Sequence, residues 1–140
     1  MVLQVNIRQI GDKGRGVAPV AFEYPFAPKT VGELIAETVK LCVSDFNRRV
    51  SSGENRVRPL TKEKLTDMAS VGKIAFGLSY NDKEQPLEPA VKNALESFED
   101  GLYRVFLNDN ELERLEDKLD ISENDTLTFI RLTMLSGRMW

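Results

Sequence analysis

The fold of this chain is decided by two stretches: RVFLNDNEL, residues 104–112, and DISENDTLTFIRLTMLSG, residues 120–137. The first reads as an apolar strand that ends in a tight polar turn and returns as a half-strand. In the second, side chains alternate over residues 126–132, with Leu127 and Phe129 on the inner face. The order predicted for the end of the chain is therefore strand, turn, half-strand, connector, last strand and a tail with a glycine.

The N-terminal stretch predicts a pair of strands. Apolar and polar side chains alternate over residues 2–10, as in a half-buried strand. The apolar side chains of this strand are Leu3, Val5 and Ile7. A glycine-rich loop leads to a second alternating run at residues 20–24. Because Pro19 cannot donate a hydrogen bond to a neighbouring strand, we expect the second strand at an edge of the sheet.

A long amphipathic helix is predicted after these strands. Thr30 and Glu33 have the spacing of a capping box, in which each residue satisfies a free backbone N–H at the helix start. Apolar residues then recur at helical spacing. They are Val31, Leu34, Ile35, Val39, Cys42, Val43 and Phe46. Such a stripe predicts a helix that packs across the inner face of the sheet.

Residues 47–100 are predicted to form an insertion between this helix and the later strands. A polar, arginine-bearing loop is expected at residues 48–59, and a short helix at residues 61–71 that ends before Gly72. Apolar side chains alternate with small ones over residues 74–80, which predicts a strand. The sequence leaves open whether this strand joins the main sheet.

The insertion ends in a predicted helix over residues 89–100, with Pro89 at its start and Gly101 as its stop. Its apolar stripe consists of Val91, Ala94, Leu95 and Phe98. Because a helix with such a stripe has to bury it, we expect the insertion to pack on the rest of the chain. Residues 1–140 are accordingly predicted to form a single domain with one core.

The residue inventory argues against catalysis. The chain contains no histidine and one cysteine, so it cannot form a Ser-His-Asp or Cys-His arrangement, a structural zinc site or an internal disulfide. That cysteine, Cys42, lies on the apolar stripe of the first helix and is expected to be a buried structural thiol. We therefore predict a protein that is not an enzyme and uses no cofactor and no metal.

Both ends of the chain resemble the ubiquitin-like (β-grasp) superfamily, in a bacterial-type version with a helical insertion. RVFLNDNEL is similar to the central strand and turn of ubiquitin, without a gap, and residues 126–132 are similar to its last strand. The resemblance covers roughly residues 2–46 and 102–137. It implies an α+β, β-grasp fold with an inserted α/β segment between the first helix and the later strands.

The resemblance also gives Phe106 an outward apolar position that partners of ubiquitin contact. The alternation of the last strand places Ile130, Leu132 and Met134 in an apolar row on the same outward side. Either the insertion covers this row or a partner does. The candidate protein-binding residues are therefore Phe106, Ile130, Leu132 and Met134.

The C-terminal tail differs from that of ubiquitin and of the small sulfur-carrier proteins. Those proteins end in Gly-Gly, whose carboxylate is adenylated by an activating enzyme. Here Gly137 follows Ser136 and precedes Arg138, Met139 and Trp140. Attachment through Gly137 would therefore require a peptidase that removes the last three residues, and then an activating enzyme.

The leading hypothesis for function is binding to another protein through the outer sheet face and the C-terminal strand. The alternatives are a carrier or modifier protein that is conjugated through Gly137, a structural subunit of a larger assembly, and an enzyme with a carboxylate-based site. A net charge of −3 and the lack of a long apolar run predict that the partner is neither nucleic acid nor a membrane. With no visible signal peptide and one thiol, we expect a cytoplasmic location.

Overall fold

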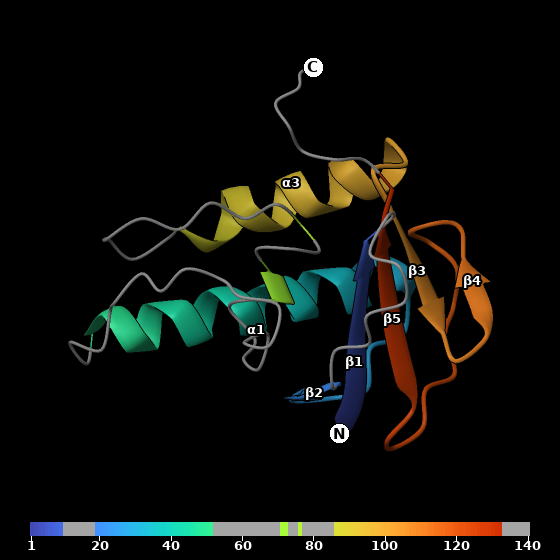
Figure 1. Ribbon diagram of the computed structural model, residues 1–140, viewed down its shortest axis with the longest axis horizontal. Helices are drawn as coiled ribbons and strands as arrows, with labels where there is room; N and C mark the ends of the chain where they lie inside the picture. The colour runs from blue at the N-terminus through green and yellow to red at the C-terminus, as the bar shows by residue number, and fades with distance from the viewer. Residues whose placement is uncertain (10–18, 52–70, 73–75, 77–85, 133–140) are drawn as a thin grey trace.

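The computed structural model describes residues 1–9, 19–51, 71–72, 76 and 86–132. In this part of the chain, one five-stranded sheet packs against two long helices, as Figure 1 shows. The strands are β1 (Val2–Gln9), β2 (Val20–Glu23), β3 (Tyr103–Leu107), β4 (Asn110–Leu112) and β5 (Thr126–Arg131). The helices are α1 (Val31–Ser51) and α3 (Leu87–Glu99). The predicted mixed α+β class is confirmed.

The sheet has the strand order β2-β1-β5-β3-β4. The central strand β5 and its neighbour β1 come from opposite ends of the chain and run parallel, whereas the other neighbours are antiparallel. The two edges are therefore β2 and β4. The edge position predicted for the strand after Pro19 is confirmed.

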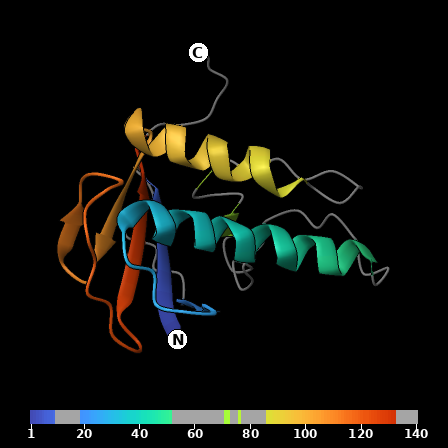
Figure 2. The same ribbon diagram turned by 180° about the vertical axis from the view of Figure 1, so that it is seen from behind.

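Alternation along the strands creates one buried face. Leu3 and Val5 of β1 and Leu127 and Phe129 of β5 are at most 1% exposed, and they lie against the apolar stripe of α1. Figures 1 and 2 show α1 and α3 side by side and antiparallel on this same face of the sheet. Since the register pairs Val5 with Leu127, one residue of slip would exchange the buried and outer faces of β5.

The start of α1 is fixed by its capping residues. The backbone N–H of Glu33 donates to Thr30 Oγ1 at 3.1 Å, as the capping box predicts. The Glu33 carboxylate accepts from the backbone N–H of Lys29 at 2.7 Å, one residue before the predicted donor. At its other end α1 continues through Ser51, so the loop expected from Arg48 is wrong for its first residues.

Helix α3 begins earlier than the sequence suggested. It starts at Leu87, with Pro86 as N-cap, so Pro89 lies in the first turn. Proline is tolerated there because backbone N–H groups of the first turn have no helical acceptor, and the N–H that proline lacks is not missed. Its stop at Gly101 is confirmed, because Gly101 has a φ of 78°. Ala94 and Phe98 are buried in the common core, as predicted.

The expected strand at residues 74–80 is wrong at the residue that the structure describes. Phe76 is helical, and Gly72, which was expected to follow a helix, is helical as well. The Phe76 side chain is 5% exposed, and its ring contacts Tyr103 and Phe129 edge-on at centroid distances of 5.3 and 5.1 Å. A short apolar run does not distinguish strand from helix by itself. The other residues of this stretch, like those of the helix expected at 61–70, lie outside the described part.

The hairpin between β3 and β4 turns at Asn108, which has a φ of 54°. Asparagine tolerates this left-handed conformation better than most residues. Asn108 also joins the hairpin to the start of β5. Its backbone N–H donates to the Thr126 carbonyl at 2.6 Å, and its Oδ1 accepts from the Thr126 N–H at 3.0 Å. The turn therefore sets where β5 begins beside β3.

Two tyrosine hydroxyls are buried in the core. Tyr103 donates to the Ala94 carbonyl at 2.7 Å and thereby links β3 to α3. Tyr24 lies 2.6 Å from Thr38 Oγ1, and Thr38 gives its own proton to the Leu34 carbonyl, which leaves Tyr24 as the donor. Burial raises the pKa of Tyr24 and of Tyr103 above the ordinary tyrosine value.

These raised pKa values predict a loss of stability at alkaline pH. The stabilisation is fully present below the pKa of an unfolded tyrosine, about 10, and is lost as the pH rises toward the folded values. Tyr24→Phe removes one ionising hydroxyl. Above pH of about 10, the wild type should lose stability relative to this variant by up to about 1.4 kcal/mol per pH unit. Urea unfolding of both proteins over this range measures the difference, and a constant difference would contradict the prediction.

Candidate protein-binding surface

The sheet face opposite α1 consists of every second residue of the strands. We call it the outer face. Its central side chains are Gln4, Asn6 and Arg8 of β1, Thr126, Thr128 and Ile130 of β5, Arg104 and Phe106 of β3, and Glu111 of β4. Charged, polar and apolar groups thus alternate over a surface that the strand register holds rigidly.

Phe106 and Ile130 lie on adjacent strands of the outer face, as expected for Phe106 from the resemblance and for Ile130 from the alternation. Phe106 is directly opposite Thr128, whereas Ile130 is directly opposite Arg104. The two apolar residues are therefore diagonal neighbours, whose separation across a sheet is about 7–8 Å. Both are partly exposed. They can present one small apolar patch because aromatic side chains reach across such a diagonal.

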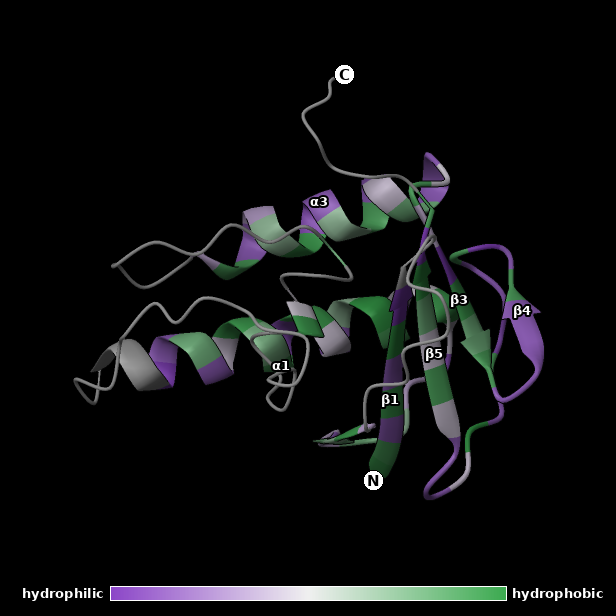
Figure 3. Ribbon diagram, in the orientation of Figure 1, coloured by the Kyte–Doolittle hydropathy of each residue, from purple (hydrophilic) through white to green (hydrophobic). Residues whose placement is uncertain are grey.

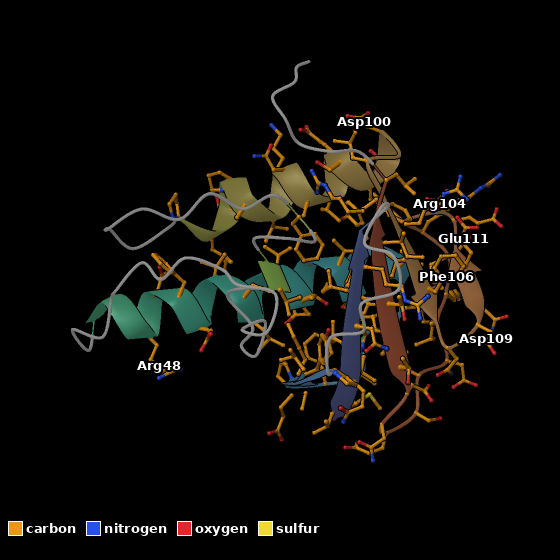
Figure 4. All side chains as sticks on the ribbon, in the orientation of Figure 1. Arg48, Asp100, Arg104, Phe106, Asp109 and Glu111 are labelled. Atoms are coloured by element: carbon orange, nitrogen blue, oxygen red, sulfur yellow. The ribbon has the colours of Figure 1, made fainter. Side chains whose placement is uncertain are left out.

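The register surrounds this patch with charges that the sequence analysis did not identify. Arg8 of β1 is opposite Ile130 on one side, and Arg104 of β3 is opposite it on the other. Glu111 is opposite Phe106 and forms an ion pair with Arg104, with an N···O distance of 3.5 Å. Figure 4 shows Arg104, Phe106 and Glu111 grouped on the β3–β4 side of the sheet.

The remaining predicted site residues lie at or beyond the end of β5. Leu132 directly follows the strand, is partly exposed, and its backbone N–H donates to the Leu102 carbonyl at 3.1 Å. Since β5 ends at Arg131, the apolar row expected at Ile130, Leu132 and Met134 is present within the strand only at Ile130. Met134 and Gly137 lie outside the described residues.

One charged side chain of β5 faces the core. Arg131 is 5% exposed and lies opposite Tyr103 on the same face as Leu127 and Phe129. Burial lowers the pKa of its guanidinium below the ordinary value. Because side chains alternate between the two faces of a strand, residue 131 falls on the same face as Leu127 and Phe129. The positive charge of arginine would by itself favour an exposed position.

Acidic residues follow β3 along the chain. Glu111 lies beside Phe106 and Asp109 is in the β3–β4 turn, whereas residues 115–119 hydrogen-bond to the residues at the start of α1. Exposed carboxylates follow one another along β4 and the connector to β5: Asp109, Glu111, Glu113, Glu116, Asp117, Asp120 and Glu123. Figure 3 shows this part of the chain as the hydrophilic end of the sheet. Because the edge strand β4 is short and carries charge, it is poorly suited to pairing with another strand.

A further aromatic side chain is exposed away from the outer face. Phe26, in the loop between β2 and α1, is 45% exposed. Among the described residues it is the one large hydrophobic side chain classed as exposed, and the sequence analysis did not single it out. Isolated apolar residues of this kind are common on protein surfaces.

The described residues contain no group of three or more histidine, cysteine, aspartate or glutamate side chains arranged to hold a metal ion. Cys42 is fully buried, as expected for a structural thiol. In the same part of the chain, neither helix has the length and apolar character needed to cross a bilayer.

Comparisons of the chain with models of protein families, with curated proteins and with solved structures give no match. The function proposed below therefore depends on the sheet topology and on the outer face.

Proposed function

We propose that this chain is a non-catalytic ubiquitin-like (β-grasp) protein that binds another protein through its outer face. The order of elements supports the fold: a strand pair, a long helix across the sheet, a second hairpin, and a last strand parallel to the first. This is the order expected from the resemblance of the two chain ends to ubiquitin. A thiol as deeply buried as Cys42 suits a reducing compartment, so we place the protein in the cytoplasm.

The observation that carries the binding proposal is the position of Phe106. It is a partly exposed phenylalanine on β3, an interior strand of the sheet, diagonal to Ile130 and on the face opposite the helices. Because the strands on both sides fix the backbone of Phe106, no backbone segment has to become ordered when a partner covers it, which favours binding. Aromatic residues near the centre of an interface commonly contribute most of its binding energy.

Phe106→Ala should therefore weaken partner binding by roughly 2 kcal/mol or more, which is about 30-fold, without unfolding the protein. The matched control is Phe26→Ala, which removes an equally large and more exposed phenylalanine away from the outer face. Each purified variant serves as bait in a lysate of the source organism. Quantitative mass spectrometry of the captured proteins, together with the melting temperature of each bait, is the measurement.

The result has to separate binding from folding. If the outer face is the interface, Phe106→Ala loses specific captured proteins that Phe26→Ala retains, and both variants melt close to the wild type. The alternative result is that the melting temperature of Phe106→Ala falls by several degrees and that the loss of binding equals the fraction of the variant that is unfolded. This result would mean that Phe106 is a packing residue. That outcome would contradict the proposed interface.

A further inference from the structure

The charges around the apolar patch are arranged asymmetrically, with cations beside Ile130 and an anion beside Phe106. Their positions limit which charged groups a partner can place next to the patch. Arg8 and Arg104 lie on either side of Ile130 in one row across the sheet. Glu111 lies beside Phe106 in the next row, toward the edge strand β4. Adjacent strands are about 4.8 Å apart, so a segment placed on Ile130 reaches both arginines.

The two arginines differ in how they are engaged. Arg8 is exposed, and the structure gives it no ion pair among the residues it describes. The Arg104 side chain is 56% exposed and forms an ion pair with Glu111, which is 35% exposed. An ion pair this open to solvent contributes little to stability, so a partner carboxylate can compete for Arg104. Arg8 is therefore the main cation available beside the patch.

Two exposed carboxylates lie on the β4 side of the patch: Glu111, which is opposite Phe106, and Asp109 in the β3–β4 turn. A long polyanion such as nucleic acid, or an anionic membrane surface, would extend from the arginines toward β4 and be repelled by these carboxylates. A short segment that places one or two carboxylates at the β1 side of the patch would avoid the repulsion.

We propose that the partner docks through a short peptide segment in which a carboxylate lies next to an apolar side chain. The apolar side chain covers Phe106 and Ile130, and the carboxylate pairs with Arg8. This inference rests on the proposed function, because it assigns the chemistry of the partner at the same surface. Charge complementarity of this kind selects and orients partners and makes binding sensitive to salt.

Selection from a phage-displayed library of random peptides tests the proposal on the full-length chain. Peptides enriched on the wild type should contain an apolar residue near Asp or Glu more often than the unselected library. Peptides enriched on Arg8→Glu should shift toward Lys and Arg, since the cation beside Ile130 has become an anion. Lys92→Glu is the matched control, because Lys92 is an exposed cation on α3, away from the outer face.

Affinities of the enriched peptides complete the test. A synthetic wild-type-selected peptide should bind Arg8→Glu about tenfold or more weakly, and Lys92→Glu within about twofold of the wild type. Melting temperatures confirm that both variants are folded. Two results would overturn this inference but not the proposed function. In the first, the peptides require Phe106 for binding but are not enriched in Asp or Glu. In the second, the peptides bind Arg8→Glu as tightly as they bind the wild type. Selection of no peptide that depends on Phe106 would overturn both the inference and the proposed function.

Discussion

Phe129→Ala should lower the free energy of unfolding by roughly 3–5 kcal/mol, which is a large part of the total stability of a domain of this size. Phe129 is fully buried in the centre of β5. Its ring contacts Phe76 at a centroid distance of 5.1 Å and Tyr103 at 6.1 Å. Truncation would leave a cavity between the sheet and the helical segments, and the surrounding rigid strands can collapse into it only in part.

Thr128→Ala is the matched control for this substitution. Thr128 is the preceding residue of the same strand and is partly exposed on the outer face. Its truncation leaves no buried cavity, so the loss should stay below about 1 kcal/mol. Chemical unfolding of both variants measures the difference. Equal losses for Phe129→Ala and Thr128→Ala would mean that the register of β5 is incorrect, because a one-residue slip exchanges the two faces.

Phe98→Ala should lower the free energy of unfolding by about 3 kcal/mol, the lower part of the range for a buried phenylalanine. Phe98 is on α3 and is 9% exposed, and its ring lies 5.9 Å from that of Tyr103 on β3. The nearby hydrogen bond from Tyr103 to Ala94 also joins the helix to the sheet. Helix α3 should therefore unfold together with the β-sheet.

The control for α3 is Glu96→Ala, which truncates an exposed side chain of the same helix and should change stability by less than about 0.5 kcal/mol. If residues 1–140 form one cooperative domain, Phe98→Ala shifts a single unfolding transition seen by both circular dichroism and tyrosine fluorescence. Two separate transitions, with only one of them shifted, would show that α3 belongs to an independent module. The single-domain prediction would then be wrong.

Local patterns in the sequence were sufficient for much of the fold. The capping residues Thr30 and Glu33 located the start of α1, and Gly101 located the end of α3, because both signals depend on backbone geometry within a few residues. Alternation assigned Phe129 to the buried face, and the resemblance to ubiquitin assigned Phe106 to the outer face. The β-grasp assignment, the protein-binding role and the absence of catalysis remain predictions.

Tertiary structure decided what local patterns could not. Phe76 is helical and its ring packs against Tyr103 and Phe129, although its neighbours in sequence alternate like a strand. Arg8 stands beside Ile130 because β1 and β5 pair in parallel, and this pairing joins residues that are far apart in the chain. By itself, the sequence determined which faces are apolar, through the period of each element. Which side chains meet across those faces depended on strand register, which only the long-range contacts of the folded chain define.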